Sequence, residues 1–218
     1  MLSVIVNKSV CPGCSAIPDL YIPLPLFNSC LSCGCAYFID KEKNVSKTEV
    51  KKIPIQPFSV VSVGTRGKYQ RHVFQIIGHI RSISTDAISN EWLMQLVNGR
   101  LLWLVECGFS YFVFDSNPVL LPGDFISDKK VGSSIVIELK EYSIVELSKQ
   151  VEFQAEGQFP EDCYTNEPYF KYEAVAAKTK EFVSICIFDK NTIEAYRGNP
   201  VTLASLELSS LERSKSWI

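Results

Sequence analysis

Eight cysteines and two histidines are the residues best suited to chemistry in this 218-residue chain. Four of the cysteines form two pairs, Cys11-Pro-Gly-Cys14 and Cys30-Leu-Ser-Cys33, which are separated by fifteen residues. This C-x2-C-x15-C-x2-C spacing is typical of four-cysteine zinc sites, because each tight turn brings two thiolates onto one metal ion. We therefore predict one structural zinc per chain, held by Cys11, Cys14, Cys30 and Cys33.

The predicted site has a closed coordination shell, since four thiolates at about 2.3 Å leave no position for water. Metal binding would supply most of the folding free energy of such a small region. Cys35 lies two residues beyond Cys33 and is an alternative ligand, although the spacing from Cys30 to Cys33 makes the better turn. Disulfides are a weaker alternative, because we recognise no secretory signal in the sequence.

Catalytic residues are harder to find, and we predict none. His72 and His79 are seven residues apart on one expected strand, so they should face apart and cannot form a dyad there. His79 shares a face with Arg81 and could bind an anion, although a half-buried strand histidine is the preferred interpretation. Cys163 lies in the acidic stretch EDCY, which would raise the pKa of its thiol and weaken it as a nucleophile.

The charge is unevenly distributed along the chain, although the net charge is only −2. Residues 1–83 carry ten Lys or Arg against four Asp or Glu, whereas residues 84–218 carry twelve against twenty. Lys41, Lys43 and Lys47 near the cysteines suggest nucleic-acid binding as an alternative function. Asp40 and Glu42 are interleaved with these lysines, however, so we expect nucleic acid to be an unlikely partner.

The apolar residues alternate with a period of two, which favours strands over helices. The segments HVFQIIGHIRSIS, NEWLMQLV, RLLWLVE and FSYFVFD follow one another between short turns, as in an antiparallel meander. Similar runs continue beyond residue 134. We predict a mainly β fold, with a small N-terminal zinc ribbon followed by antiparallel β-meanders that form a sandwich or open barrel. Pro54 and Pro57 mark a linker, so we place the ribbon at 1–53, the β-rich domain at 58–208 and a tail at 209–218.

Two turns set the expected register of the first meander. Asn98-Gly99 is typical of a two-residue hairpin loop, because both positions need positive φ. A second two-residue loop at Cys107-Gly108 gives a consistent pairing. The residues then expected on one buried face are Trp92, Met94, Leu96, Leu101, Trp103, Val105, Phe112 and Phe114.

Several of these segments resemble the bacterial domain of unknown function numbered 4178. The resemblance is carried by Gln75-Ile-Ile-Gly-His-Ile80, Asn90-Glu91-Trp92, Trp103-Leu104 and Gly108-Phe-Ser-Tyr111, and by the stretch from Ala155-Glu-Gly157 to Tyr196-Arg-Gly198. It implies a β-rich domain over residues 60–208 that has no established reaction, often behind a cysteine ribbon. Ser15 follows Cys14 where a glycine is usual in that ribbon.

The preferred function is that of a non-enzymatic cytoplasmic binding or adaptor protein with a protein partner. The resemblance implies such a partner-binding role in a membrane-stress-related system. We expect no transmembrane segment, because no run approaches the ~18 apolar residues that a membrane helix needs. The alternatives are binding of nucleic acid or another polyanion through the basic ribbon, and an enzyme of unrecognised type that uses His79 or Cys163.

Overall fold

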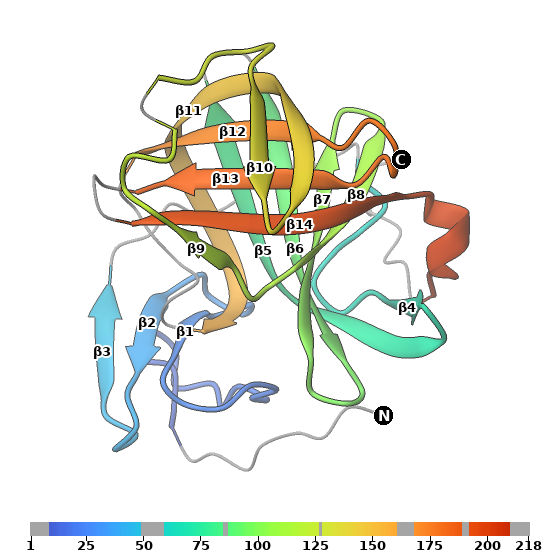
Figure 1. Ribbon diagram of the computed structural model, residues 1–218. Coiled ribbons are helices and arrows are strands. Elements are labelled where there is room, and N and C mark those ends of the chain that lie inside the picture. The colour runs from blue at the N-terminus through green and yellow to red at the C-terminus, as the bar shows by residue number, and fades with distance from the viewer. Residues whose placement is uncertain are drawn as a thin grey trace.

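Antiparallel strands provide almost all the regular structure of the computed structural model, which describes residues 9–48, 59–84, 87–126, 128–160, 168–188 and 192–209 (Figure 1). The first half contains β1 Leu26–Ser29, β2 Ala36–Ile39, β3 Val45–Thr48, β4 Arg66–Tyr69, β5 His72–Ser84, β6 Ile88–Leu96, β7 Leu101–Cys107 and β8 Ser110–Asp115. The second half contains β9 Val119–Leu121, β10 Ser134–Ile137, β11 Lys140–Pro160, β12 Tyr169–Val175, β13 Phe182–Ile187, β14 Ile193–Val201 and the 3-10 helix η2 Leu203–Leu206.

Eight of these strands close into a ring. The order of pairing is β5, β6, β7, β8, β14, β13, β12 and β11, and β11 pairs in turn with β5. The predicted mainly β fold of antiparallel meanders is confirmed. The sequence alone did not distinguish a sandwich from an open barrel, and the structure shows eight strands that close into a ring. Within the described residues, no helix is both long enough and apolar enough to cross a membrane.

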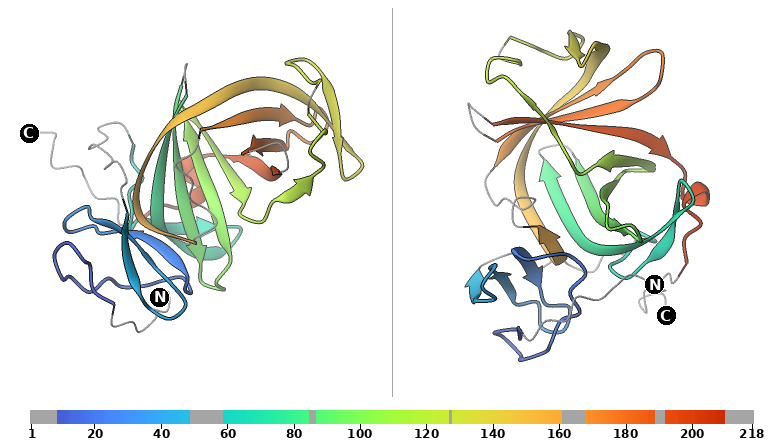
Figure 2. Two further views of the ribbon diagram at one scale, coloured as in Figure 1. Left: turned by 90° about the vertical axis from the view of Figure 1, so that its left-hand side faces the viewer. Right: turned by 60° about the horizontal axis from the view of Figure 1, so that its bottom comes forward.

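The long strand β11 joins the ring to the N-terminal region. Its first part pairs with β10 and β12, its middle with β5, and its last residues with β1. β2 and β3 then continue the sheet beyond β1 as the hairpin expected after the second cysteine pair. Figure 2 shows these N-terminal strands beside the end of β11 in both views.

The expected separation of the two regions into independent cores is not seen. One cluster of buried residues combines Leu20, Phe27 and Tyr37 of the N-terminal region with Trp103 and Phe159 of the ring. The proposed linker at Pro54 and Pro57 lies outside the described residues, as does the tail beyond residue 209. The domain limits therefore stay a prediction, but a shared sheet and a shared core connect the two regions.

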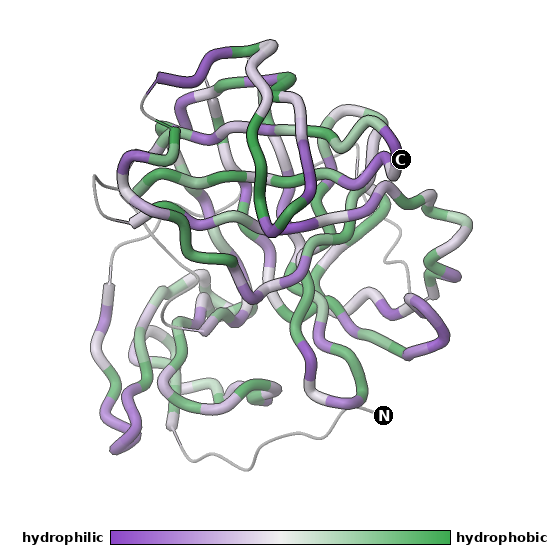
Figure 3. Tube along the Cα trace, viewed as in Figure 1, coloured by the Kyte–Doolittle hydropathy of each residue, from purple (hydrophilic) through white to green (hydrophobic). Residues whose placement is uncertain are grey.

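Both faces of the meander β5–β8 are buried. One face points into the ring and belongs to the cluster that includes Trp103 and Phe114, whereas the other packs with Val61 and Leu206 of η2. A third cluster covers the outer face of β12–β14 beneath β10. In Figure 3, hydrophobic residues run along the ring strands, and hydrophilic ones gather at the β2–β3 and β4–β5 turns.

The predicted register of the β6–β7 hairpin is wrong by one residue. The loop has three residues, Val97 to Gly99, because the amide of Leu96 donates to the carbonyl of Arg100 (2.9 Å) and the amide of Gly99 donates to the carbonyl of Leu96 (2.8 Å). Gly99 has φ of 85°, as expected in a three-residue loop whose last position is left-handed. Met94 consequently pairs with Leu102 rather than with Trp103.

The eight residues expected on one face are therefore divided between two. Trp92, Met94 and Leu96 lie on the outer side of the meander, whereas Trp103, Val105 and Phe114 face the ring interior. The next loop is Gly108-Phe109, since Cys107 pairs with Ser110. That second error shifts the register by two residues, which leaves side chains on their expected faces.

Candidate metal centre and ring cavity

The two cysteine pairs have the same backbone structure. In each turn the amide of the first cysteine donates to the carbonyl five residues later, and its carbonyl accepts from the amide four residues later. These bonds join Cys11 to Ala16 (2.8 Å) and Ser15 (2.9 Å), and Cys30 to Cys35 (2.8 Å) and Gly34 (2.7 Å). The repeated geometry presents both pairs of thiols to one point between them.

Ser15 and Gly34 occupy matching positions in the two turns. Both have positive φ, 61° at Ser15 and 73° at Gly34. Glycine adopts this left-handed conformation without the steric cost that a Cβ brings. The missing glycine after Cys14 therefore leaves the turn intact, with the strain carried by Ser15.

The four predicted ligands form a cluster that is able to hold a metal ion. All four sulfur atoms lie within 4.8 Å of one another. Cys11 Sγ is 3.6 Å from Cys33 Sγ, and Cys14 Sγ is 3.8 Å from Cys30 Sγ. Metal–sulfur bonds of about 2.3 Å in a tetrahedron require sulfur atoms about 3.8 Å apart, so the donor set fits such an ion.

Cys35 lies beside this cluster without belonging to it. A Cβ placed on Gly13 would lie 2.8 Å from the Cβ of Cys35, so Cys35 packs directly against the first turn. The sulfur of Cys35 lies 3.9 Å from the carbonyl oxygen of Ala36. Cys33 rather than Cys35 therefore completes the four-sulfur group.

The crowded thiols affect one another's protonation. Burial would raise the pKa of Cys11, but hydrogen bonds from the Gly13 and Cys14 backbone and from neighbouring thiols outweigh it and lower the pKa to about 7. A backbone hydrogen bond involving Ala16 lowers the pKa of Cys14, but the adjacent thiols raise it to about 12. A metal ion would displace the protons from all four sulfur atoms.

Two glutamines of the ring bind the backbone of the loop between the cysteine pairs. Gln158 on β11 accepts a hydrogen bond from the amide of Tyr21 (3.0 Å) and donates to the carbonyl of Asp19. Gln95 on β6 donates to the carbonyl of Tyr21 (2.5 Å). Because both glutamines are buried, these contacts tie the cysteine region to the ring through bonds that water does not replace easily.

His79 is fully buried rather than half-buried as predicted, with 1% of its surface exposed. Its Nε2 donates to Asn90 Oδ1 (3.0 Å), its Nδ1 lies 3.4 Å from Glu156, and its ring stacks on Trp92 at 3.6 Å. Asn90 in turn donates to Glu106 (3.0 Å). These contacts make His79 part of a buried polar network, where a substrate has no access.

The remaining candidates from the sequence separate in space. A bulge between Ile76 and Gly78 interrupts the alternation from which His72 and His79 were expected to face apart. Seven strand residues at about 3.3 Å each nevertheless keep the two rings far from contact. Cys163 lies outside the described residues.

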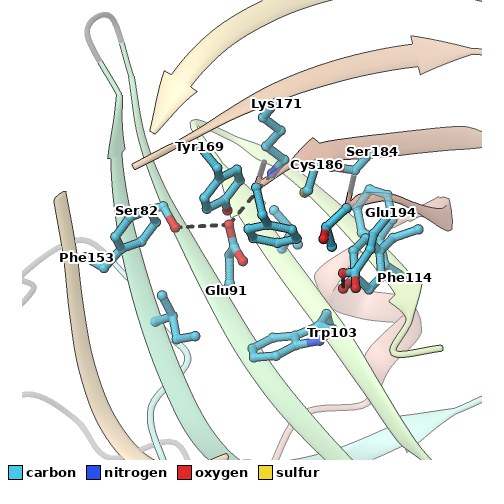
Figure 4. A pocket seen from close by; sticks show the side chains of 15 residues that line it. Ser82, Glu91, Trp103, Phe114, Phe153, Tyr169, Lys171, Ser184, Cys186 and Glu194 are labelled. Carbon is cyan, nitrogen blue, oxygen red and sulfur yellow. Dashed lines mark hydrogen bonds and ion pairs between the residues drawn. The ribbon is translucent and has the colours of Figure 1, made fainter. Parts of the chain in front are cut away.

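A cavity of about 310 Å³ lies inside the ring (Figure 4). On its wall, Lys171 Nζ lies 3.2 Å from Glu173 and 3.7 Å from Glu91, and Ser82 Oγ donates to Glu91 (3.1 Å). Burial would lower the pKa of Lys171, but Glu173 and Glu91 raise it well above its ordinary value. Burial also raises the pKa of Glu173, against the lowering effect of Lys171.

Sequence reasoning missed this group of charged residues. Lys171 and Glu173 are two residues apart in the strand YFKYEAV, which places both on one face. That spacing predicts two charged side chains on one face of the strand. It does not predict that this face points into a cavity, which depends on closure of the ring. Cys186, which pairs with Lys171 across β12 and β13, is also buried, and burial raises the pKa of its thiol to about 12.

Searches with the chain against family models, curated proteins and solved structures gave no match. The resemblance to the domain of unknown function numbered 4178 therefore stays a prediction. The cysteine cluster and the ring cavity are the features from which function has to be argued.

Proposed function

We propose that this chain is a non-enzymatic cytoplasmic binding or adaptor protein whose N-terminal region is held together by one structural zinc ion. The observation that carries the proposal is the arrangement of four sulfur atoms with edges of 3.6 Å and 3.8 Å. Zinc fits a tetrahedral set of four thiolates, and the full shell leaves no position for a reacting water.

Zinc is preferred over hard cations because thiolates are soft ligands, whereas calcium and magnesium prefer oxygen. The cytoplasm is the compartment that keeps such thiols reduced and available for a metal. Among the described residues, the cysteines are free of disulfide bonds, as this proposal requires.

A surface on β11 and β12 supports a role in binding a protein partner. We define the outer stripe as three apolar side chains that are 43–49% exposed: Leu147, Val151 and Phe170. Lys149, opposite Phe170 in the sheet, places its ammonium 5.9 Å from the centre of that ring. Adjacent exposed apolar side chains with a polar neighbour are a frequent feature of protein contacts.

Metal analysis with two matched variants tests the zinc assignment. Protein purified without added metal should contain close to one zinc per chain. Cys33→Ser should lose it, whereas Cys35→Ser should keep it, because only Cys33 belongs to the four-sulfur group. A wild-type zinc content near zero, or loss of zinc from Cys35→Ser alone, would contradict this ligand set.

A crosslinking pull-down beside a broad hydrolase and transferase screen tests the adaptor role. Phe170→Ser should reduce capture of a partner, whereas Glu141→Gln, at an exposed position of β11, should leave capture unchanged. Turnover that survives purification and disappears on substitution of His79 or Cys163 would make the protein an enzyme instead.

A further inference from the structure

The ring cavity carries more negative than positive charge. Glu91 and Glu194 line it together with one cation, Lys171, and Glu173 forms an ion pair with the same ammonium. One ammonium ion is therefore shared among neighbouring carboxylates. Charge interactions are stronger here than at the surface, because the cavity walls have a low dielectric constant.

Glu194 on β14 is the carboxylate that Lys171 does not reach. The hydroxyl of Tyr196 donates a hydrogen bond to Glu194, and no cationic side chain among the described residues forms an ion pair with this carboxylate. Ser184 also lines the cavity. Its buried hydroxyl lies beside Glu173, its direct partner in the sheet, and a hydrogen bond between the two side chains lowers the pKa of that carboxyl.

Aromatic rings supply most of the remaining wall. Phe153 stacks on Tyr169 with ring centres 5.4 Å apart, and Tyr169 contacts Phe188 at 4.8 Å. Figure 4 shows Trp103 and Phe114 on the sides of the same space, with Glu91 and Glu194 directed into it. Aromatic faces attract ammonium groups and also accommodate an apolar ligand body.

We propose that the ring cavity binds a small organic cation, an amine with a compact apolar body. Its ammonium group pairs with Glu194, Ser184 offers a hydrogen bond, and its apolar part packs among Trp103, Phe114 and Tyr169. A cavity of about 310 Å³ lies at the small end of the range for ligand pockets and fits a molecule with one aromatic ring. The zinc centre and the outer stripe play no part in this proposal.

Three probes of the same shape test the charge of the ligand. Binding of 3-phenylpropylamine, 3-phenylpropanol and 3-phenylpropionate to the intact protein should be measured by isothermal titration calorimetry at neutral pH. We expect the amine to bind at least tenfold more tightly than the alcohol, and the carboxylate to bind most weakly. Equal binding of amine and alcohol, tighter binding of the carboxylate, or no binding of any probe at millimolar concentration would overturn the proposal.

A matched pair of variants locates the ammonium group. Glu194→Gln should weaken binding of the amine about tenfold and leave binding of the alcohol unchanged, since only the charge is removed. Glu141→Gln, which removes the same charge from an exposed position of β11, should leave both affinities unchanged. Thermal unfolding confirms that each variant is folded. An unchanged amine affinity in folded Glu194→Gln protein would exclude the proposed contact.

Discussion

Two glycines decide how closely β5 and β11 approach each other where the ring closes. Gly78 and Gly157 are direct partners in the sheet. A Cβ on Gly78 would lie 2.4 Å from the carbonyl oxygen of Gln158 and 2.7 Å from the ring of Phe159. This contact gives a physical reason for the glycine within Gln75-Ile-Ile-Gly-His-Ile80, because the opposing backbone cannot move as a flexible side chain can.

Gly78→Ala should therefore destabilise the protein by about 3 kcal/mol, at the upper end of the range for overpacking. Gly99→Ala is the comparison, since a Cβ there meets nothing within 4 Å and incurs only the cost of its left-handed backbone, about 1 kcal/mol. Urea unfolding measures both. A Gly78→Ala variant as stable as Gly99→Ala would show that the two strands separate easily.

The metal ligands were predicted from spacing alone, whereas the charged group in the ring was not. Cys11, Cys14, Cys30 and Cys33 lie within one short stretch, so local turn geometry brings them together. Glu91, Lys171 and Glu194 come from β6, β12 and β14, which meet only when the ring closes. The spacing of residues along the sequence does not show which distant strands become neighbours.

At the level of elements, the fold class followed from alternation, but the register did not. An apolar period of two shows where the strands lie. It does not show whether the loop between two strands has two or three residues, which here depends on the hydrogen bond from the amide of Leu96 to the carbonyl of Arg100. The expected burial of apolar side chains could not reveal the wrong register, because both faces of β6 and β7 are apolar. Trp103 is buried in the observed register as well. A strand with a polar face would have exposed the error.

Glu181 connects the start of β13 to the β10–β11 hairpin and makes that contact sensitive to acid. Its carboxylate accepts hydrogen bonds from Lys140 Nζ (2.7 Å) and from the hydroxyl of Tyr142 (2.5 Å). Burial would raise the pKa of Glu181, but these partners outweigh it and hold the pKa below its ordinary value of 4.5. The stabilisation is therefore present above that value and is lost as the pH falls through the lower folded-state pKa.

Glu181→Gln should cost about 1–2 kcal/mol at pH 7, and the difference from the wild type should shrink below pH 4. Urea unfolding at pH 7 and at pH 3 measures this change. Glu141→Gln serves as the control, since its exposed carboxylate should matter little at either pH. A deficit of Glu181→Gln that is equal at both pH values would show that charge plays no part.

For the molecule as a whole, the cysteine region and the ring should lose stability together. β1 pairs with β11, and Gln95 and Gln158 bind the loop that the metal centre orders. Cys11→Ser or removal of zinc should therefore weaken at least two hydrogen bonds to the ring, about 2 kcal/mol in total. For a chain of this size, that loss corresponds to a fall of about 4–8 °C in Tm.

Thermal unfolding followed by tryptophan fluorescence and by circular dichroism tests this coupling. We expect one coincident transition that moves to lower temperature when the zinc is removed, and Cys35→Ser should leave it in place. Two separate transitions, with the tryptophan signal unaffected by chelation, would instead support the independent domains that the sequence suggested.

The pairing of β1 with the last residues of β11 also has a consequence during protein synthesis. Leu26 pairs with Pro160, which the ribosome adds 134 residues later, so β1 has no strand partner on β11 until then. At about 5–20 residues per second this delay is roughly 7–27 s. All four cysteines of the cluster are made before residue 34, so the nascent chain can take up its metal long before the ring exists. An early metal-bound turn would then keep the exposed edge of β1 ordered until its permanent neighbour arrives.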